Sequence, residues 1–264
     1  MEVLEAPSDE IAELLAELEY EPEAVAIPGV GVVTVRTVAE LPLELLALLE
    51  ESKAEISGRR VWPGSVLLAL AMTGGEASAL LKGSAVLELG SGSGLASIVA
   101  AKLGASLVVV TDGDQTSVDL SVGNLGDNGL APGVGGGTDG VGATVVARRL
   151  LWGDFDGFLA EGGAAVPPHV PAGGYDVVLA ADVMYKPFLP PLLFGTVKSL
   201  LRPGGCCLLC HVIRAGVTHE LVVAAAEASG LRVTLLPLPR EHFPHEHCSE
   251  AEADGAKLYR IEHA

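Results

Sequence analysis

Glycine recurs at alternate positions in the segment Gly90-Ser91-Gly92-Ser93-Gly94, directly after the apolar run 85–89. The run predicts a buried strand, and the spacing of the apolar residues that follow predicts a helix. A strand, a tight turn and a helix N-terminus in this order bring backbone N–H groups close to a ligand. Glycine suits the turn because it adopts positive φ cheaply and has no side chain to hold the ligand away. The segment therefore predicts a small-molecule site at Gly90, Ser91 and Gly92.

The ligand that this turn predicts is not a dinucleotide. The Gly-x-Gly-x-x-Gly pattern requires its third glycine where Leu95 stands here. Glu88 precedes Gly90 by two residues inside the apolar strand, where an acid is costly to bury unless it meets a cation or a hydrogen-bond donor. A cationic ligand with an amino group meets that need better than a pyrophosphate. The structural alternative is an ordinary strand–turn–helix with a partly exposed Glu88.

A carboxylate stands at the end of the next predicted strand. Asp112 lies 22 residues beyond Gly90, and a carboxylate at this place can accept hydrogen bonds from both hydroxyls of a ribose. The alternative is a cap for the helix that starts near Thr116, which Asp114 could supply instead. We therefore favour Asp112 as a ligand residue.

A second acid, Asp182, ends the strand predicted over 175–181, and Tyr185 follows three residues later. In a doubly wound order this strand occupies the centre of the sheet, beside the switch point where ligands bind. We expect Asp182 and Tyr185 to stand beside the reactive end of the ligand. The alternative is that Asp182 only caps the following turn.

The chain has two tryptophans, and both stand at predicted element ends. Trp62 comes just ahead of the helix that leads into the glycine strand, where its ring could cover a ligand and attract a cation. Trp152 follows the third strand and could stack on an adenine at the carboxyl edge of the sheet. Packing in the core is the structural alternative for both.

Strands and helices alternate from residue 85 onward, which is typical of a parallel sheet with helices on both faces. The last strand follows an irregular acidic segment and is expected to pair antiparallel. Strands are predicted over 85–90, 106–111, 143–149, 175–181, 205–213, 231–237 and 257–262. Helices are predicted over 94–103, 116–126, 188–201 and 217–229. A glycine-rich insertion is predicted over 127–142, and a loop rich in proline and glycine over 164–174.

The N-terminal part of the chain has a different pattern. Residues 8–20 predict a capped amphipathic helix, 25–38 a hairpin-like strand pair, and 41–49 a short helix. We therefore divide the chain into an N-terminal extension over 1–57 and a main domain over 58–264.

Composition limits the partners and the compartment. The net charge of −18 repels phosphate backbones, so nucleic acid is not expected as a partner. A run of 18 apolar residues is missing, as is a secretory signal, which predicts no membrane contact and a cytoplasmic protein, with the nucleus as the alternative.

Two clusters resemble metal or redox sites. Cys207 and Cys210 have the Cys-x-x-Cys spacing, but on a strand they face opposite sides, so we expect buried thiols in a reducing compartment. The histidine-rich segment 242–248 is expected to be solvated surface, and no metal is predicted.

Five segments in order resemble the seven-β-strand, S-adenosylmethionine-dependent protein-lysine methyltransferases of eukaryotes. They are Val61-Trp62-Pro63-Gly64-Ser65, Leu87-Glu88-Leu89-Gly90-Ser91-Gly92-Ser93-Gly94-Leu95, Thr111-Asp112-Gly113-Asp114, Leu151-Trp152-Gly153-Asp154 and Ala181-Asp182-Val183-Met184-Tyr185. The resemblance runs from about Arg59 to the C-terminus. It implies an α/β fold, Rossmann-like and doubly wound, with a mostly parallel seven-stranded sheet of the class I methyltransferase type. The glycine-rich insertion after Asp127 departs from the family pattern.

The resemblance also implies roles for individual residues. S-adenosyl-L-methionine is the implied cofactor, in a pocket formed by Trp62, the Gly90–Gly92 turn, Asp112, Trp152 and Ala181. The Asp-x-x-Tyr motif, here Asp182 and Tyr185, is associated in this family with the target lysine. We therefore expect Asp182→Ala to abolish methyl transfer while cofactor binding largely survives.

The expected reaction is methyl transfer to a lysine of a protein substrate, with an elongation factor favoured, by a monomeric enzyme. The alternatives are calmodulin or another acceptor, a small molecule or nucleobase, and a partner protein that binds S-adenosylmethionine without catalysis. A nicotinamide-dependent reductase is disfavoured by Leu95, and a base methyltransferase by the lack of an Asp-Pro-Pro-Tyr motif.

Overall fold

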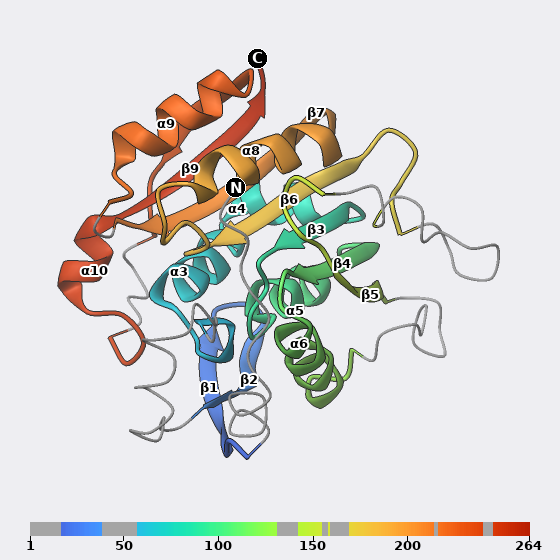
Figure 1. The fold of residues 1–264 in the computed structure, drawn as a ribbon. Helices are drawn as coiled ribbons and strands as arrows, with labels where there is room; N and C mark the ends of the chain where they lie inside the picture. The colour runs from blue at the N-terminus through green and yellow to red at the C-terminus, as the bar shows by residue number, and fades with distance from the viewer. Residues whose placement is uncertain are drawn as a thin grey trace.

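A seven-stranded sheet forms the centre of the molecule in the computed structural model (Figure 1). The structure describes residues 17–38, 57–130, 142–154, 158, 169–213, 216–239 and 245–264. The strands of the sheet are β3 (Ala85–Leu89), β4 (Leu107–Asp112), β5 (Thr144–Arg149), β6 (Tyr175–Ala181), β7 (Leu201–Val212), β8 (Leu231–Leu236) and β9 (Ala256–His263). The helices around it are α3 (Pro63–Met72), α4 (Gly75–Leu81), α5 (Leu95–Lys102), α6 (Gln115–Asp127), α8 (Leu189–Leu200), α9 (His219–Ala228) and α10 (Glu250–Gly255).

The strand order is β5-β4-β3-β6-β7-β9-β8. The five strands from β5 to β7 are parallel, and β9 runs antiparallel to both β7 and β8. This arrangement confirms the predicted fold class, the central position of β6 and the antiparallel last strand. The chain winds outward from β3 to β5 and then returns to β6, so the switch point lies between β3 and β6, where ligands of open α/β sheets bind.

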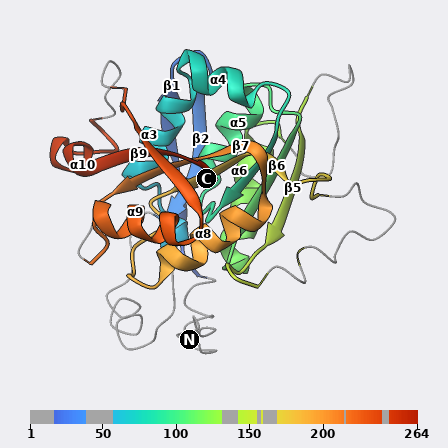
Figure 2. The same cartoon turned by 90° about the horizontal axis from the view of Figure 1, so that it is seen from above.

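Helices cover both faces of the sheet (Figure 2), and a hydrophobic cluster fills each face. One hydrophobic cluster joins α3 and α5 to the sheet, and the other joins α8 and α9 to it. Cys206 and Cys210 belong to the first cluster and Cys207 to the second, which confirms that Cys207 and Cys210 face opposite sides. All four cysteines are buried free thiols.

The predicted strand pair near the N-terminus is a hairpin of β1 (Tyr20–Ile27) and β2 (Gly31–Val38). Its apolar side chains share the core of α3 and α5. The Arg36 N–H donates to Asn124 Oδ1 of α6 (2.8 Å), and the Asn128 side chain donates to the Thr34 carbonyl (2.7 Å). The hairpin therefore packs directly on the main sheet's helices.

Three sequence predictions differ from the structure or lie outside it. Residues 17–19 are not helical and Tyr20 begins β1, so the helix predicted over 8–20 is wrong over 17–20. The rest of that helix up to residue 16 and the helix predicted over 41–49 lie outside the described residues. The segment before β9, predicted to be irregular, contains α10, which starts with a capping box of Ser249 and Glu252.

Within the described ranges, no single helix is long and apolar enough to cross a bilayer. The neighbouring helices α3 and α4 reach that length only as a pair, and they are bent by 88° relative to each other.

Candidate functional site

The glycine turn after β3 lies tightly against two other segments. A Cβ added at Gly90 (φ +71°) would lie 2.6 Å from Val183 Cγ1, just beyond β6. A Cβ at Gly92 (φ +50°) would lie 2.9 Å from the Gly58 carbonyl oxygen in η1 (Ser57–Arg59). Both positions thus need glycine, for backbone conformation and for space. The turn brings the end of β3 together with the ends of β6 and η1.

Glu88 of β3 is 2% exposed and points to helix α5. Its Oε2 accepts hydrogen bonds from the Ser97 N–H (3.0 Å) and from the Ser97 hydroxyl. The partly exposed Glu88 of the structural alternative is therefore excluded, and the donor that a buried acid requires is a serine in the first turn of α5. Contact with the amino group of a ligand stays a prediction.

The stability of the protein should fall as Glu88 ionises. Burial raises the pKa of Glu88 to about 7, although the Ser97 hydrogen bonds oppose this. The native state then binds more protons than the unfolded chain between about pH 4.5 and 7, so the free energy of unfolding falls as the pH rises through this window. We expect Glu88→Gln to remove roughly 3 kcal/mol of this pH dependence, from 1.36 kcal/mol per unit of pKa. Urea unfolding of the wild type and Glu88→Gln at pH 5 and pH 8 measures the difference. An equal change in the free energy of unfolding between the two pH values in both proteins would contradict the prediction.

Asp112 is held at the end of β4 by two backbone amides. Its Oδ2 accepts from the Gly92 N–H (2.9 Å) and its Oδ1 from the Asp114 N–H (3.0 Å). Asp114, two residues later, is the N-cap of α6 and accepts from the N–H groups of Thr116 and Ser117. The capping role therefore belongs to Asp114. Each Asp112 oxygen keeps a lone pair for a further donor, and burial raises the pKa of Asp112 to about 6.

Both tryptophans are partly exposed, so neither is fully buried in the core. Trp152 does pack against the hydrophobic cluster on the α8 and α9 face, which bears out the core-packing alternative in part. Trp62 is the N-cap residue of α3, and its indole N–H donates to the Ser57 carbonyl (2.6 Å). A Cβ at Gly90 would lie 3.5 Å from Trp152 Cζ2, so the Trp152 ring borders the glycine turn. Stacking on an adenine stays a prediction.

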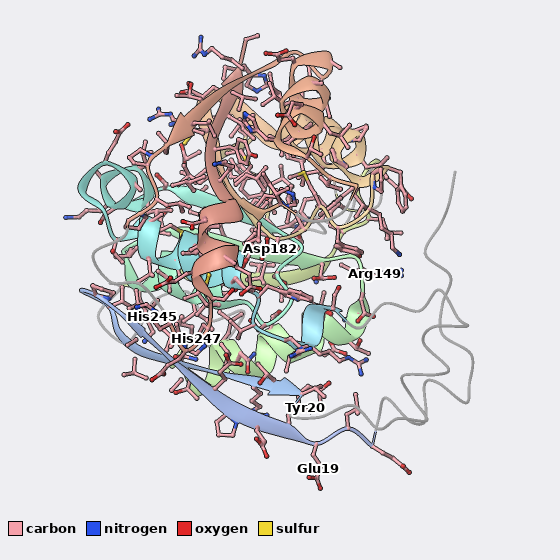
Figure 3. All side chains as sticks on the ribbon, turned by 90° about the vertical axis from the view of Figure 1, so that its left-hand side faces the viewer. Glu19, Tyr20, Arg149, Asp182, His245 and His247 are labelled. Carbon is pink, nitrogen blue, oxygen red and sulfur yellow. The ribbon has the colours of Figure 1, made fainter. Side chains whose placement is uncertain are left out.

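Asp182 directly follows β6 and lies inside the molecule, 8% exposed (Figure 3). Its Oδ2 accepts from the Gly64 N–H in the first turn of α3, and its Oδ1 accepts from the Val212 N–H at the end of β7, both at 2.8 Å. Ala181 and Tyr185 are partly exposed, and the Lys186 ammonium lies 5.5 Å from the centre of the Tyr185 ring. Asp182 thus connects three elements, which a turn cap does not do.

Three residues in this region were not predicted from the sequence. They are Gly58, Val183 and Ser97, which contact or border the predicted residues Gly92, Gly90 and Glu88. Gly58 gave no signal because its partner lies 34 residues away in the chain. Ser97 could have been found, because its place in the first turn of the helix after the glycines faces the preceding strand.

The turn also fits a polar ligand. The buried Ser91 hydroxyl has no hydrogen-bond partner among the described residues, although Ser91 is only 7% exposed. A buried hydroxyl of this kind needs a partner. The Ser91 hydroxyl, the Asp112 carboxylate and the glycine turn together fit a nucleoside that carries a polar substituent.

The segment 242–248 was expected to be solvated surface. His247 Nδ1 lies 2.9 Å from Glu23 Oε1 of β1, which ties the described part of the segment to the hairpin (Figure 3). Among the described residues, no group of three potential metal ligands comes together, and His242 lies outside that set.

The fold and the site edge define a class I methyltransferase architecture, and comparisons with known proteins agree. A Streptococcus mutans protein named as a SAM-dependent methyltransferase shares this fold with a TM-score of 0.54 at 15% identity, over 91% of this chain and 55% of that one. A family model described as lysine methyltransferase matches residues 42–225. The chain belongs to this lysine methyltransferase family.

Two curated relatives are similar over most of the chain. The protein-lysine N-methyltransferase EFM3 of Chaetomium thermophilum is 32% identical over 215 residues, which cover 78% of this chain and 57% of that protein. The EEF1A lysine methyltransferase 3 of mouse is 34% identical over 184 residues, which cover 69% of this chain and 63% of that protein. The chain thus spans about three fifths of the length of these relatives.

Proposed function

We propose that the chain transfers a methyl group from S-adenosyl-L-methionine to a lysine side chain of a protein substrate. One observation supports this most: the glycine turn, Asp112 and Asp182 lie together at the carboxyl edge of the sheet in a member of the lysine methyltransferase family. The relatives' names support the same reaction.

We assign cofactor binding to residues around the switch point. Asp112 would accept hydrogen bonds from the ribose hydroxyls. Trp62 and Trp152 would border the nucleoside. The backbone of Gly90, Ser91 and Gly92, together with Glu88 and Ala181, would hold the methionine part. The cofactor would supply the methyl group of its sulfonium, and the neutral thioether S-adenosylhomocysteine would leave without needing a proton. The protein's task is therefore to position a neutral amine.

The acceptor side of the site is formed by the segment after β6. A lysine, with a reference pKa of about 10.4, must lose its proton before it can attack. We propose that the amine enters beside Asp182 and Tyr185, and that the Tyr185 hydroxyl with nearby carbonyls holds it.

We propose an elongation factor as the substrate, because one relative is named for EEF1A and because the Ala181–Tyr185 segment resembles that group. The net charge of −18 favours a basic protein surface as the partner over nucleic acid. A monomer in the cytoplasm, with no membrane contact, remains our expectation.

Incubation with methyl-tritiated S-adenosylmethionine tests the function. We expect label in recombinant elongation factor 1A and, after acid hydrolysis, in methylated lysine. Calmodulin serves as the control for the choice of substrate. The Asp112→Ala variant serves as the control for the cofactor site. If the protein binds S-adenosylhomocysteine but labels nothing in a methylation-deficient lysate, it is a binding protein and not an enzyme.

A further inference from the structure

Helix α3 begins without a cap of its own. Its N-cap residue, Trp62, makes no side-chain capping hydrogen bond, Pro63 has no N–H, and its first turn has no acidic residue. The first free N–H groups of a helix need an acceptor, and the positive end of the helix dipole favours an anion there. In α3 the Gly64 N–H finds its acceptor 118 residues away, in the Asp182 carboxylate.

The same carboxylate also binds the end of β7. While Oδ2 accepts from Gly64, Oδ1 accepts from the Val212 N–H at 2.8 Å, and the Asp182 N–H donates to the Cys210 carbonyl at 2.9 Å. Asp182 therefore fastens α3 to the neighbouring ends of β6 and β7.

The backbone at this junction is strained. Among the described residues, Asp182 is the one non-glycine residue with positive φ, +52°. Such a conformation persists when surrounding contacts determine it, and it is common at functional sites. Three hydrogen bonds to two other elements provide that determination here.

Gly64 allows the close approach. A Cβ at Gly64 would lie 2.6 Å from the Asp182 carboxyl carbon and 2.8 Å from each of its oxygens. Glycine is therefore required at position 64 because a side chain there would overlap the Asp182 carboxylate. Trp62 stands two residues before this contact, so any shift of the helix end moves its ring.

We propose that Asp182 is a positioning residue, a remote N-cap of α3 that holds Trp62 against the cofactor site. This inference rests on the proposed function for its effect on the cofactor, but not for the contact itself. It differs from the role implied by the family resemblance, in which loss of Asp182 leaves cofactor binding largely intact. Here the loss must weaken cofactor binding as well.

Trp62 fluorescence tests the contact without any ligand. Trp62 and Trp152 are the two tryptophans of the chain, so Trp152→Phe leaves Trp62 as the single reporter. In that background we expect Asp182→Asn to shift the emission of Trp62, because the amide cannot accept from both N–H groups. The matched control is Asp176→Asn, at the other end of β6, where the carboxylate accepts from the Ala85 N–H (2.7 Å) and pairs with Arg202. It should leave the emission unchanged.

Calorimetric titration with S-adenosylhomocysteine tests the consequence. We expect Asp182→Asn to weaken binding about tenfold, as the loss of one charged hydrogen bond would, and Asp176→Asn to stay within about twofold. If Asp182→Asn does not fold, Gly64→Ala displaces the carboxylate while Asp182 remains, and the same tenfold loss is expected.

Two results separate the hypotheses. Unchanged Trp62 emission and unchanged affinity in both Asp182→Asn and Gly64→Ala would overturn the positioning role and leave Asp182 at the acceptor amine. Failure of the wild-type protein to bind S-adenosylhomocysteine would instead refute the proposed function, and the Trp62 emission would still decide whether Asp182 holds α3.

Discussion

Asp112→Ala is expected to weaken binding of S-adenosylhomocysteine by at least about a hundredfold. Hydrogen bonds to a charged group contribute about 1.5 to 3 kcal/mol each, and the ribose offers two hydroxyls to one carboxylate. The Gly92 and Asp114 amides already fix this carboxylate in place, so little entropy is lost when the ligand binds. Isothermal titration of both proteins measures the change.

Asp114→Ala is the matched control. Asp114 is the N-cap of α6, so its loss should cost about 1 kcal/mol of stability and leave the affinity unchanged. The pH dependence gives a second test. Because the pKa of Asp112 is raised to about 6 by burial, protons compete with the ligand below that pH, and affinity should rise as the pH increases through 6. Equal losses of affinity in Asp112→Ala and Asp114→Ala would show that Asp112 does not bind the ribose.

The sheet could be predicted from the sequence because its strands are short apolar runs separated by helical patterns. One strand boundary differs because a residue pair formed before an irregular stretch lengthens the strand. The strand predicted over 205–213 pairs continuously with β6 from Cys206 onward, but β7 begins at Leu201, which pairs with Tyr175. A register shift separates these two pairs, so Arg202-Pro203-Gly204-Gly205 interrupts the regular ladder, as its turn-like sequence predicts. The helix α10 was missed although its capping box is visible in the sequence.

The position of the site could also be predicted, because the carboxyl ends of parallel strands meet at one edge. The hydrogen-bond partners of the acidic residues could not be predicted. Glu88 was expected to need a donor, but the sequence does not say that Ser97 supplies it. Asp182 and Gly64 are separated by 118 residues, and only the path of α3 across the sheet brings them together.

The glycine turn gives the other large effect. Gly90→Ala should lower the free energy of unfolding by about 2 to 4 kcal/mol, the sum of about 1 kcal/mol for a side chain at φ +71° and 1 to 3 kcal/mol for overpacking against Val183. Affinity for S-adenosylhomocysteine should fall as well, because relieving the overlap with Val183 shifts the turn or the start of the segment after β6.

Two variants separate the causes of that loss. Gly83 has nearly the same φ, +75°, but a Cβ there meets nothing within 4 Å, so Gly83→Ala measures the backbone cost alone and should not affect the affinity. Val183→Ala, combined with Gly90→Ala, removes the atom at 2.6 Å and should recover the steric part of the loss but not the backbone part. Chemical unfolding of the wild type, Gly90→Ala, Val183→Ala and the double variant gives the coupling energy. The contradicting result is a Gly90→Ala protein that loses no more stability than the Gly83→Ala protein and binds S-adenosylhomocysteine with unchanged affinity. That result would show that the close contact between the glycine turn and the end of β6 does not determine the shape of this site.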